Sequence, residues 1–317
     1  MRFSFLICFL CFGSLLASAS AKKEGYPKEI NISYVESPFN LQLMVMKEKG
    51  MLESAFQEKN IRVRWWDINS GAHQAQALAA GSLDIASVIN SISVIMANAA
   101  GNRVEIAGIV SRPTRTYALM TGQEGPQAIQ DLKGKTIAGP KGTVLHQMLV
   151  AALGSQGLSL TDVNFISMDL PEARTALLAG KIDGALLAAS LIIRSEEAGL
   201  KTLFTADGYI NPLLLTAVRP GFAKKYPELL EIYLKTQQEA YTWILHNPEE
   251  AVGIGAKIQQ ISPEDGRALY TWSGMDSSFT QNDLASLTRD TAFLLEQKMI
   301  EQSIDPADIT LPVAFGK

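Results

Sequence analysis

Two stretches of the chain, ALAAGSLDIASVI at residues 77–89 and ALLAGKIDGALLA at residues 176–188, repeat one pattern. In each, a short run of alanine and leucine that fits a helix stops at a glycine, Gly81 or Gly180. Glycine tolerates the left-handed backbone conformation that commonly ends a helix. A Leu-Asp or Ile-Asp pair then leads into an apolar run that fits a strand buried on both faces. The repeat predicts two similar lobes, and two lobes imply a cleft between them.

The repeat extends outward, because the order strand, helix, strand, helix, strand occurs twice. We expect strands at 30–35, 61–68 and 85–89 with helices at 41–49 and 74–80, and then strands at 135–138, 163–168 and 184–188 with helices at 143–156 and 173–179. This order favours an α/β fold with a mostly parallel sheet, flanked by helices, in each lobe. Extended segments at 104–118 and 202–218 are the two predicted hinge crossings. They divide the chain into a discontinuous lobe one, 22–112 plus 213–317, and lobe two, 113–212.

The first 21 residues have the pattern of a cleaved signal peptide. Arg2 is a minimal positive region, Phe3–Leu16 is apolar but short for a membrane span, and Ala19–Ala21 offers a small-residue cleavage site. Both cysteines, Cys8 and Cys11, lie within this segment. The mature chain would therefore contain no disulfide or thiol nucleophile, which fits a periplasmic protein without a lipid anchor.

The composition and charge of the chain limit the kinds of partner that it is expected to bind. The chain has 317 residues, of which 47% are hydrophobic and 19% charged, as in a soluble globular protein of this size. Its net charge of −4 becomes −5 without Arg2, and no basic stripe or tail is visible. We therefore expect neither nucleic acid nor an anionic membrane surface as a partner.

Small polar loops stand where a ligand of such a fold would bind. Ligands of open parallel sheets bind beyond the carboxyl ends of the strands, where loops lead into helix N-termini. The loops at these positions are Ser37–Asn40, Ser70–His73, Asn90-Ser91, Gly139–His146, Asp169–Glu172 and Ala189-Ser190. Free N–H groups and the positive end of a helix dipole attract anions. The sequence thus predicts a site for a small anion.

Pro140–Val144 is the clearest of these loops. Thr143 is placed to cap a helix, and Gly142 would let a ligand approach the backbone closely. Gly71–His73 offers a second such loop in the opposite lobe. Capping alone explains most threonines at this position, so the hypothesis depends on two loops that face each other across a cleft.

Several single side chains are further candidates. His73 and His146 can each donate to an anion or point to solvent. Arg112 lies in the first hinge crossing and can bind an anion, with a surface salt bridge as the alternative. Asn90 directly follows the predicted buried strand at 85–89 and ranks first for the floor of the cleft. Trp272 lies in a loop-like stretch and either covers the cleft or packs in the core.

Signatures of known enzymes are missing from the sequence. It contains no G-x-S-x-G, H-E-x-x-H, Walker or G-x-G-x-x-G motif. The three histidines do not have the spacing of metal ligands. We therefore expect no catalytic residues, no metal and no cofactor.

Taken together, the motifs resemble those of solute-binding proteins of bacterial ABC importers in the nitrate, sulfonate and taurine group. The stretches that carry the resemblance are Leu43–Leu52, Ser70–Ala86, Leu132–Thr143 and Leu177–Ala185. This family shares its fold with thiamine-pyrimidine binding proteins. The resemblance implies a two-lobed (type II) periplasmic binding protein fold, which closes on a small ligand by hinge motion and delivers it to a membrane permease.

Matched to the family position by position, the ligand contacts implied are Asn40, Gly71, Ala72, His73, Asn90, Thr143, Val144 and the residues after Ala188. The loops add Ser91, Gly142, Glu172, Ala189 and Ser190. The favoured function is the capture of a sulfonate-like organic anion by a monomer. A pyrimidine or thiamine precursor and an aromatic acid are alternative ligands. An enzyme of pyrimidine-synthase or menaquinone-pathway type on the same scaffold, and a receptor-docking sensor, are alternative functions.

Overall fold

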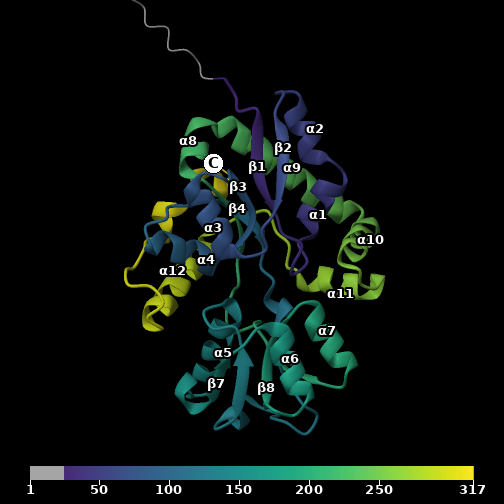
Figure 1. Ribbon diagram of the computed structural model, residues 1–317, viewed down its shortest axis with the longest axis vertical. Coiled ribbons are helices and arrows are strands. Elements are labelled where there is room, and N and C mark those ends of the chain that lie inside the picture. Colours follow the sequence, from purple (N-terminus) through teal and green to yellow (C-terminus); the bar gives the residue numbers. More distant parts are fainter. Residues whose placement is uncertain (1–24, 317) are drawn as a thin grey trace, which may run out of the picture.

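The structure is a computed structural model in which residues 25–316 are described. The predicted signal peptide, residues 1–21, lies outside the described residues. Two lobes follow one another along the longest axis, and each has a five-stranded sheet flanked by helices (Figure 1). The predicted α/β fold with two lobes is confirmed.

The sheet of lobe one has the strand order β2-β1-β3-β10-β4. Its strands are β1 (Glu29–Tyr34), β2 (Arg62–Asp67), β3 (Ile85–Asn90), β4 (Glu105–Ser111) and β10 (Leu214–Val218). β1 is parallel to β2 and β3, whereas β10 is antiparallel to its neighbours β3 and β4. The predicted hinge crossings are too long, because 104–118 contains β4 and 202–218 contains β10; the segments that pass between the lobes are 112–116 and 206–213. Because β10 follows the second of these crossings, it enters the sheet from the opposite end and runs against the others.

The sheet of lobe two has the equivalent order β7-β6-β8-β5-β9. Its strands are β5 (Tyr117–Thr121), β6 (Thr136–Gly139), β7 (Asn164–Ser167), β8 (Gly184–Ala188) and β9 (Lys201–Thr205). β6 is parallel to β7 and β8, whereas β5, which follows the first crossing, is antiparallel to β8 and β9. The prediction of mostly parallel sheets is therefore confirmed, with one reversed strand in each.

The helices cover both faces of the sheets and continue into a C-terminal group (Figure 1). Their bounds are α1 (Leu41–Glu48), α2 (Met51–Gln57), α3 (Gly71–Ala80), α4 (Ser91–Ala99), α5 (Val144–Gly154), α6 (Leu170–Leu178), α7 (Ser190–Glu197), α8 (Pro220–Lys225), α9 (Pro227–His246), α10 (Pro248–Gln259), α11 (Pro263–Trp272) and α12 (Gln281–Glu296). Among the helices that were not predicted, α4 and α7 each follow their strand with almost no linker. Trp272, expected in a loop, is the last residue of α11 and packs partly buried against apolar clusters of both lobes.

The repeated stretch has the same structural role in both lobes. Gly81 and Gly180 have the expected left-handed backbone, with φ of 75° and 66°. The carboxylate of Asp84 accepts a hydrogen bond of 2.9 Å from the backbone N–H of Asn31 in β1. The carboxylate of Asp183 accepts one of 2.8 Å from Thr136 at the start of β6. Each aspartate therefore fixes the first strand of its repeat, β1 or β6, to the start of the third, β3 or β8, which explains why the pair recurs.

Within residues 25–316, no helix is both long enough and apolar enough to cross a membrane.

Candidate ligand-binding site

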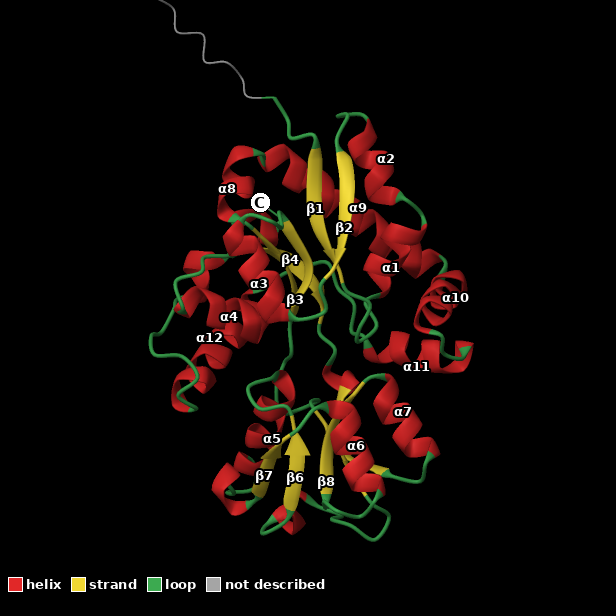
Figure 2. Ribbon diagram, in the orientation of Figure 1, coloured by secondary structure: helices red, strands yellow, loops and turns green. Residues whose placement is uncertain are grey.

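The carboxyl ends of the strands in the two lobes face each other. In Figure 2 the arrowheads of β1 and β2 point toward lobe two, and that of β6 points toward lobe one. Six helices begin at this face, and the residues that precede their first turns are Asn40, Ser70, Asn90, Thr143, Asp169 and Ala189. The structure therefore places the predicted loops between the lobes, at helix N-termini.

In lobe one, the starts of α3 and α4 are in direct contact. A Cβ atom on Gly71 would lie 2.4 Å from Oγ of Ser93 and 2.8 Å from Nδ2 of Asn90. Asn90 caps α4, because its Oδ1 accepts a hydrogen bond of 2.8 Å from the backbone N–H of Ser93. Ser70 caps α3 by accepting from the backbone N–H of His73. Gly71 is therefore required for this approach, and its position next to Asn90 brings two predicted site residues together.

Apolar contacts connect these helix starts across the lobes. Ala189, before α7 of lobe two, is buried in a cluster with Phe39 and Leu41 at the start of α1. Val144, the first residue of α5, is buried in an apolar cluster whose other members lie mainly in lobe one, among them Ile92 of α4. The predicted residues of both lobes are thus close in space.

The first turns of these helices differ from those of most other helices in their content of acidic side chains. Within the described chain, the first turns of α1, α3, α4, α5 and α7 contain no acidic residue, and only α6 among the six has one, Glu172. By contrast, five of the six other helices, α2, α9, α10, α11 and α12, have acidic residues there, and only the short helix α8 has none. Acidic side chains normally stabilise this end of a helix dipole. Five helix ends between the lobes therefore retain their positive potential.

Two predictions about the α5 loop are corrected by the structure. His146 is completely buried, where its ring stacks on Phe165 at 5.1 Å and meets the edge of Phe293 at 5.9 Å. Its Nδ1 accepts a hydrogen bond of 3.2 Å from the backbone N–H of Gly142, and burial lowers its pKa. A Cβ on Gly142 would meet the methyl group of Met299 at 2.6 Å. These two residues pack against the C-terminal part of the chain, so we leave them out of the proposed ligand contacts.

Three further polar residues are engaged with the protein itself. The side chain of Thr143 does not cap α5 as predicted but donates to the carbonyl of Pro140 at 2.9 Å. Ser91 is buried and donates to the carboxylate of Asp290 at 2.6 Å. Nδ2 of buried Asn40 donates to the carbonyls of the preceding turn. What the site offers to a ligand at these positions is mainly backbone.

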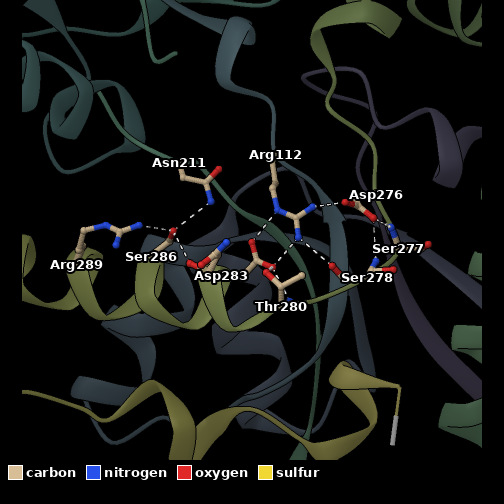
Figure 3. Close-up of polar contacts among 10 residues, drawn as sticks. Arg112, Asn211, Asp276, Ser277, Ser278, Thr280, Asp283, Ser286 and Arg289 are labelled. Atoms are coloured by element: carbon tan, nitrogen blue, oxygen red, sulfur yellow. Dashed lines mark hydrogen bonds and ion pairs between the residues drawn. The ribbon is translucent and has the colours of Figure 1, made fainter. Parts of the chain in front are cut away.

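Arg112 forms the salt bridges that were the alternative to ligand binding (Figure 3). Its guanidinium donates to both carboxylate oxygens of Asp283, at 2.7 and 2.6 Å, and also to Asp276 and the carbonyl of Ser278. Burial raises the pKa of Asp283, but hydrogen bonds from Arg112 and Thr280 outweigh this and lower it overall. Arg112 thus fastens the first hinge crossing to the start of α12.

The remaining predicted residues are accessible or lie in a tight turn. Ala72, His73 and Glu172 are exposed, and Ser190 is half-buried. Ala189 has φ of 52° and ψ of −128°, a strained conformation for a residue with a side chain. It turns the chain sharply from β8 into α7 and exposes a new helix start to the other lobe. Over the described part of the chain, no three His, Cys, Asp or Glu side chains could together hold a metal ion.

Known proteins are similar to this chain in sequence and in fold. A putative aliphatic sulfonates-binding protein of Bacillus subtilis is 29% identical over 89% of this chain and 85% of its own length. The crystal structure of the periplasmic aliphatic sulphonate binding protein SsuA from Escherichia coli superposes with a TM-score of 0.83 at 19% identity, covering 90% of this chain and 92% of that one. The desulfurization enzyme DSZB has the same fold, with a TM-score of 0.71 at 14% identity over 92% of this chain and 98% of its own.

The family described as NMT1/THI5 like matches residues 41–251, which is most of both lobes. That match includes both copies of the repeated stretch and all six helix starts between the lobes. The chain belongs to the NMT1/THI5-like family.

Proposed function

We propose that this protein is the periplasmic substrate-binding component of an ABC importer and captures a small organic anion of the sulfonate class. The ligand contacts helix starts of both lobes, here divided at 22–112 plus 213–317 and 113–212, and the closed form is presented to the permease by a monomer. The names of the sulfonate-binding relatives support the ligand class.

The observation that carries this proposal is the missing acid in five first turns. A sulfonate has three oxygens that accept hydrogen bonds and one negative charge, so free backbone N–H groups at these ends satisfy it without a cationic side chain. The proposed contacts are Gly71, Ala72, His73 and Asn90 in lobe one and Thr143, Val144, Ala189 and Ser190 in lobe two, with Asn40 and Glu172 at the margins.

Binding is tested in lobe one by isothermal titration calorimetry with ethanesulfonate. Ala72→Asp puts a like charge beside the start of α3, whereas Gly71 has no room for a side chain. We expect this variant to lose binding, because the carboxylate occupies the anion position. Ala79→Asp, an exposed alanine in the last turn of the same helix, is the control and should bind as the wild type does. Equal affinity of Ala72→Asp and wild type would contradict the proposal.

Lobe two requires its own test, because a ligand that closes the hinge must contact both lobes. Thr143→Asp should abolish binding in the same way. Thr175→Asp is the control, since Thr175 also lies in lobe two and its hydroxyl also donates to a proline carbonyl, at 2.8 Å against 2.9 Å for Thr143. If only one of the two variants, Ala72→Asp or Thr143→Asp, loses ethanesulfonate binding, the anion binds to a surface site on that lobe alone.

The likeness to DSZB supports an enzyme as the second candidate. We propose a binding protein instead, because both cysteines lie in the predicted signal peptide and the curated relatives are named as binding proteins. Mass spectrometry after prolonged incubation should recover the sulfonate unchanged. A product that accumulates with protein concentration would favour the enzyme.

A further inference from the structure

One face of α12 is polar although it is buried. Asp283, Ser286 and Asp290 are spaced by three and four residues, which places them on the same side of the helix, and they are 0%, 2% and 5% exposed. Arg112 of the first hinge crossing donates to Asp283, and Asn211 of the second donates to Ser286 at 3.1 Å (Figure 3). Two of the three positions thus bind the two segments that connect the lobes.

The third position, Asp290, binds the lobes themselves. One carboxylate oxygen accepts a hydrogen bond of 2.6 Å from Ser91, the first residue of α4 in lobe one. The other accepts one of 2.6 Å from Nε2 of Gln147, in the first turns of α5 in lobe two. Ser91 directly follows Asn90, and Gln147 lies one turn beyond Thr143. Both neighbours are proposed ligand contacts, so one carboxylate lies behind two helix starts from opposite lobes.

Because Asp290 is buried, its carboxylate needs both hydrogen bonds. Gln147 is 7% exposed and both donors are neutral, so the carboxylate has lost most of its water and depends on these bonds. Removal of either donor leaves an acceptor unsatisfied in a low-dielectric site. The start of α5 also packs against the same region through the ring contact of His146 with Phe293. In this conformation, contacts with α12 therefore hold α5 in its position relative to α4.

We propose that Asp290 is a positioning residue for ligand binding, which holds the N-termini of α4 and α5 at the separation at which one anion contacts both. The link to anion binding rests on the proposed function, whereas the restraint between the lobes does not. The bonds of Asp290 therefore favour the closed arrangement of the lobes, which the ligand also stabilises.

The test cuts the bond between the lobes without changing charge. Gln147→Met removes the donor to Asp290, and Gln237→Met is the matched control, because Gln237 is equally buried but hydrogen-bonds Thr216 within lobe one, at 3.1 Å. We expect both variants to be less stable in urea, but only Gln147→Met to bind ethanesulfonate about tenfold more weakly. Unchanged affinity in a folded Gln147→Met would overturn the positioning role. If this variant does not fold, Gln147→Met combined with Asp290→Asn removes the unpaired charge and should show the same loss.

A second measurement needs no ligand. The cysteine-free mature sequence allows spin labels at Gln57→Cys in lobe one and Lys181→Cys in lobe two, both exposed. In ligand-free protein, Gln147→Met should broaden the distance distribution between the labels, whereas Gln237→Met should leave it as in the wild type. An unchanged distribution overturns the restraint. A broadened distribution in a protein that binds no sulfonate supports the restraint and rejects the proposed function.

Discussion

Replacement of Gly71 by alanine tests whether the close approach of α3 to α4 at this position stabilises the protein. The added Cβ would meet Oγ of Ser93 at 2.4 Å, its Cβ at 2.9 Å and Nδ2 of Asn90 at 2.8 Å, all shorter than normal contacts. Relief requires both side chains to move, and Asn90 then loses its capping bond to α4. A lost cap costs about 1 kcal/mol and overpacking about 1–3 kcal/mol. The expected loss of unfolding free energy is therefore about 2–4 kcal/mol.

The control is Gly253→Ala in α10, where a Cβ would have nothing within 4 Å. This substitution should stabilise the protein by about 0.4–1 kcal/mol, because alanine restricts the unfolded chain. Urea unfolding followed by circular dichroism measures both values, and calorimetry measures ethanesulfonate binding. A Gly71→Ala variant as stable as the wild type, with unchanged affinity, would refute the contact between α3 and α4 as the basis of the site.

Two further predictions concern the hinge. Arg112→Leu leaves the buried carboxylate of Asp283 without its cation and should cost about 3–5 kcal/mol in urea unfolding, part of which Asp283→Asn should restore in the double variant; a loss below about 1 kcal/mol would contradict this. Because the folded-state pKa of Asp283 is lowered, its stabilisation is present above its usual pKa of about 3.9 and is lost as the pH falls through the folded value. Below about pH 4, the unfolding free energy of the wild type should thus fall more steeply than that of Asp283→Asn. Parallel curves of unfolding free energy against pH for the two proteins would contradict this prediction.

Much of the fold could be predicted because it is encoded locally. β8 has the predicted bounds, and Gly81 and Gly180 end their helices as expected. The starts of α4 and α7 could not be predicted, since Asn90 is both the last residue of β3 and the residue before α4, and Ala189 alone separates β8 from α7. In neither case does a glycine, a proline or a polar run separate the two elements.

The helix starts between the lobes were predicted as loops, but the directions of their side chains were not. That Asn90 and Thr143 precede helices at the strand ends follows from the alternation of strand and helix. That Ser91 and His146 point away into the protein depends on α12, which lies more than 130 residues further along the chain. A signal for this existed in the sequence, because Asp283, Ser286 and Asp290 have the spacing of one face of a helix.

The two lobes share strand order and the role of the repeated aspartate, so the asymmetry of the molecule comes from the C-terminal helices. Figure 2 shows α12 and α11 on opposite sides of the region between the lobes. α12 contacts lobe two through Gln147, and α11 contacts it through Trp272, which packs against clusters of both lobes. Lobe two is therefore not a free copy of lobe one but is supported from both sides. The repeat supplies two similar sets of helix starts, and the part of the chain outside the repeat determines how far apart they are held.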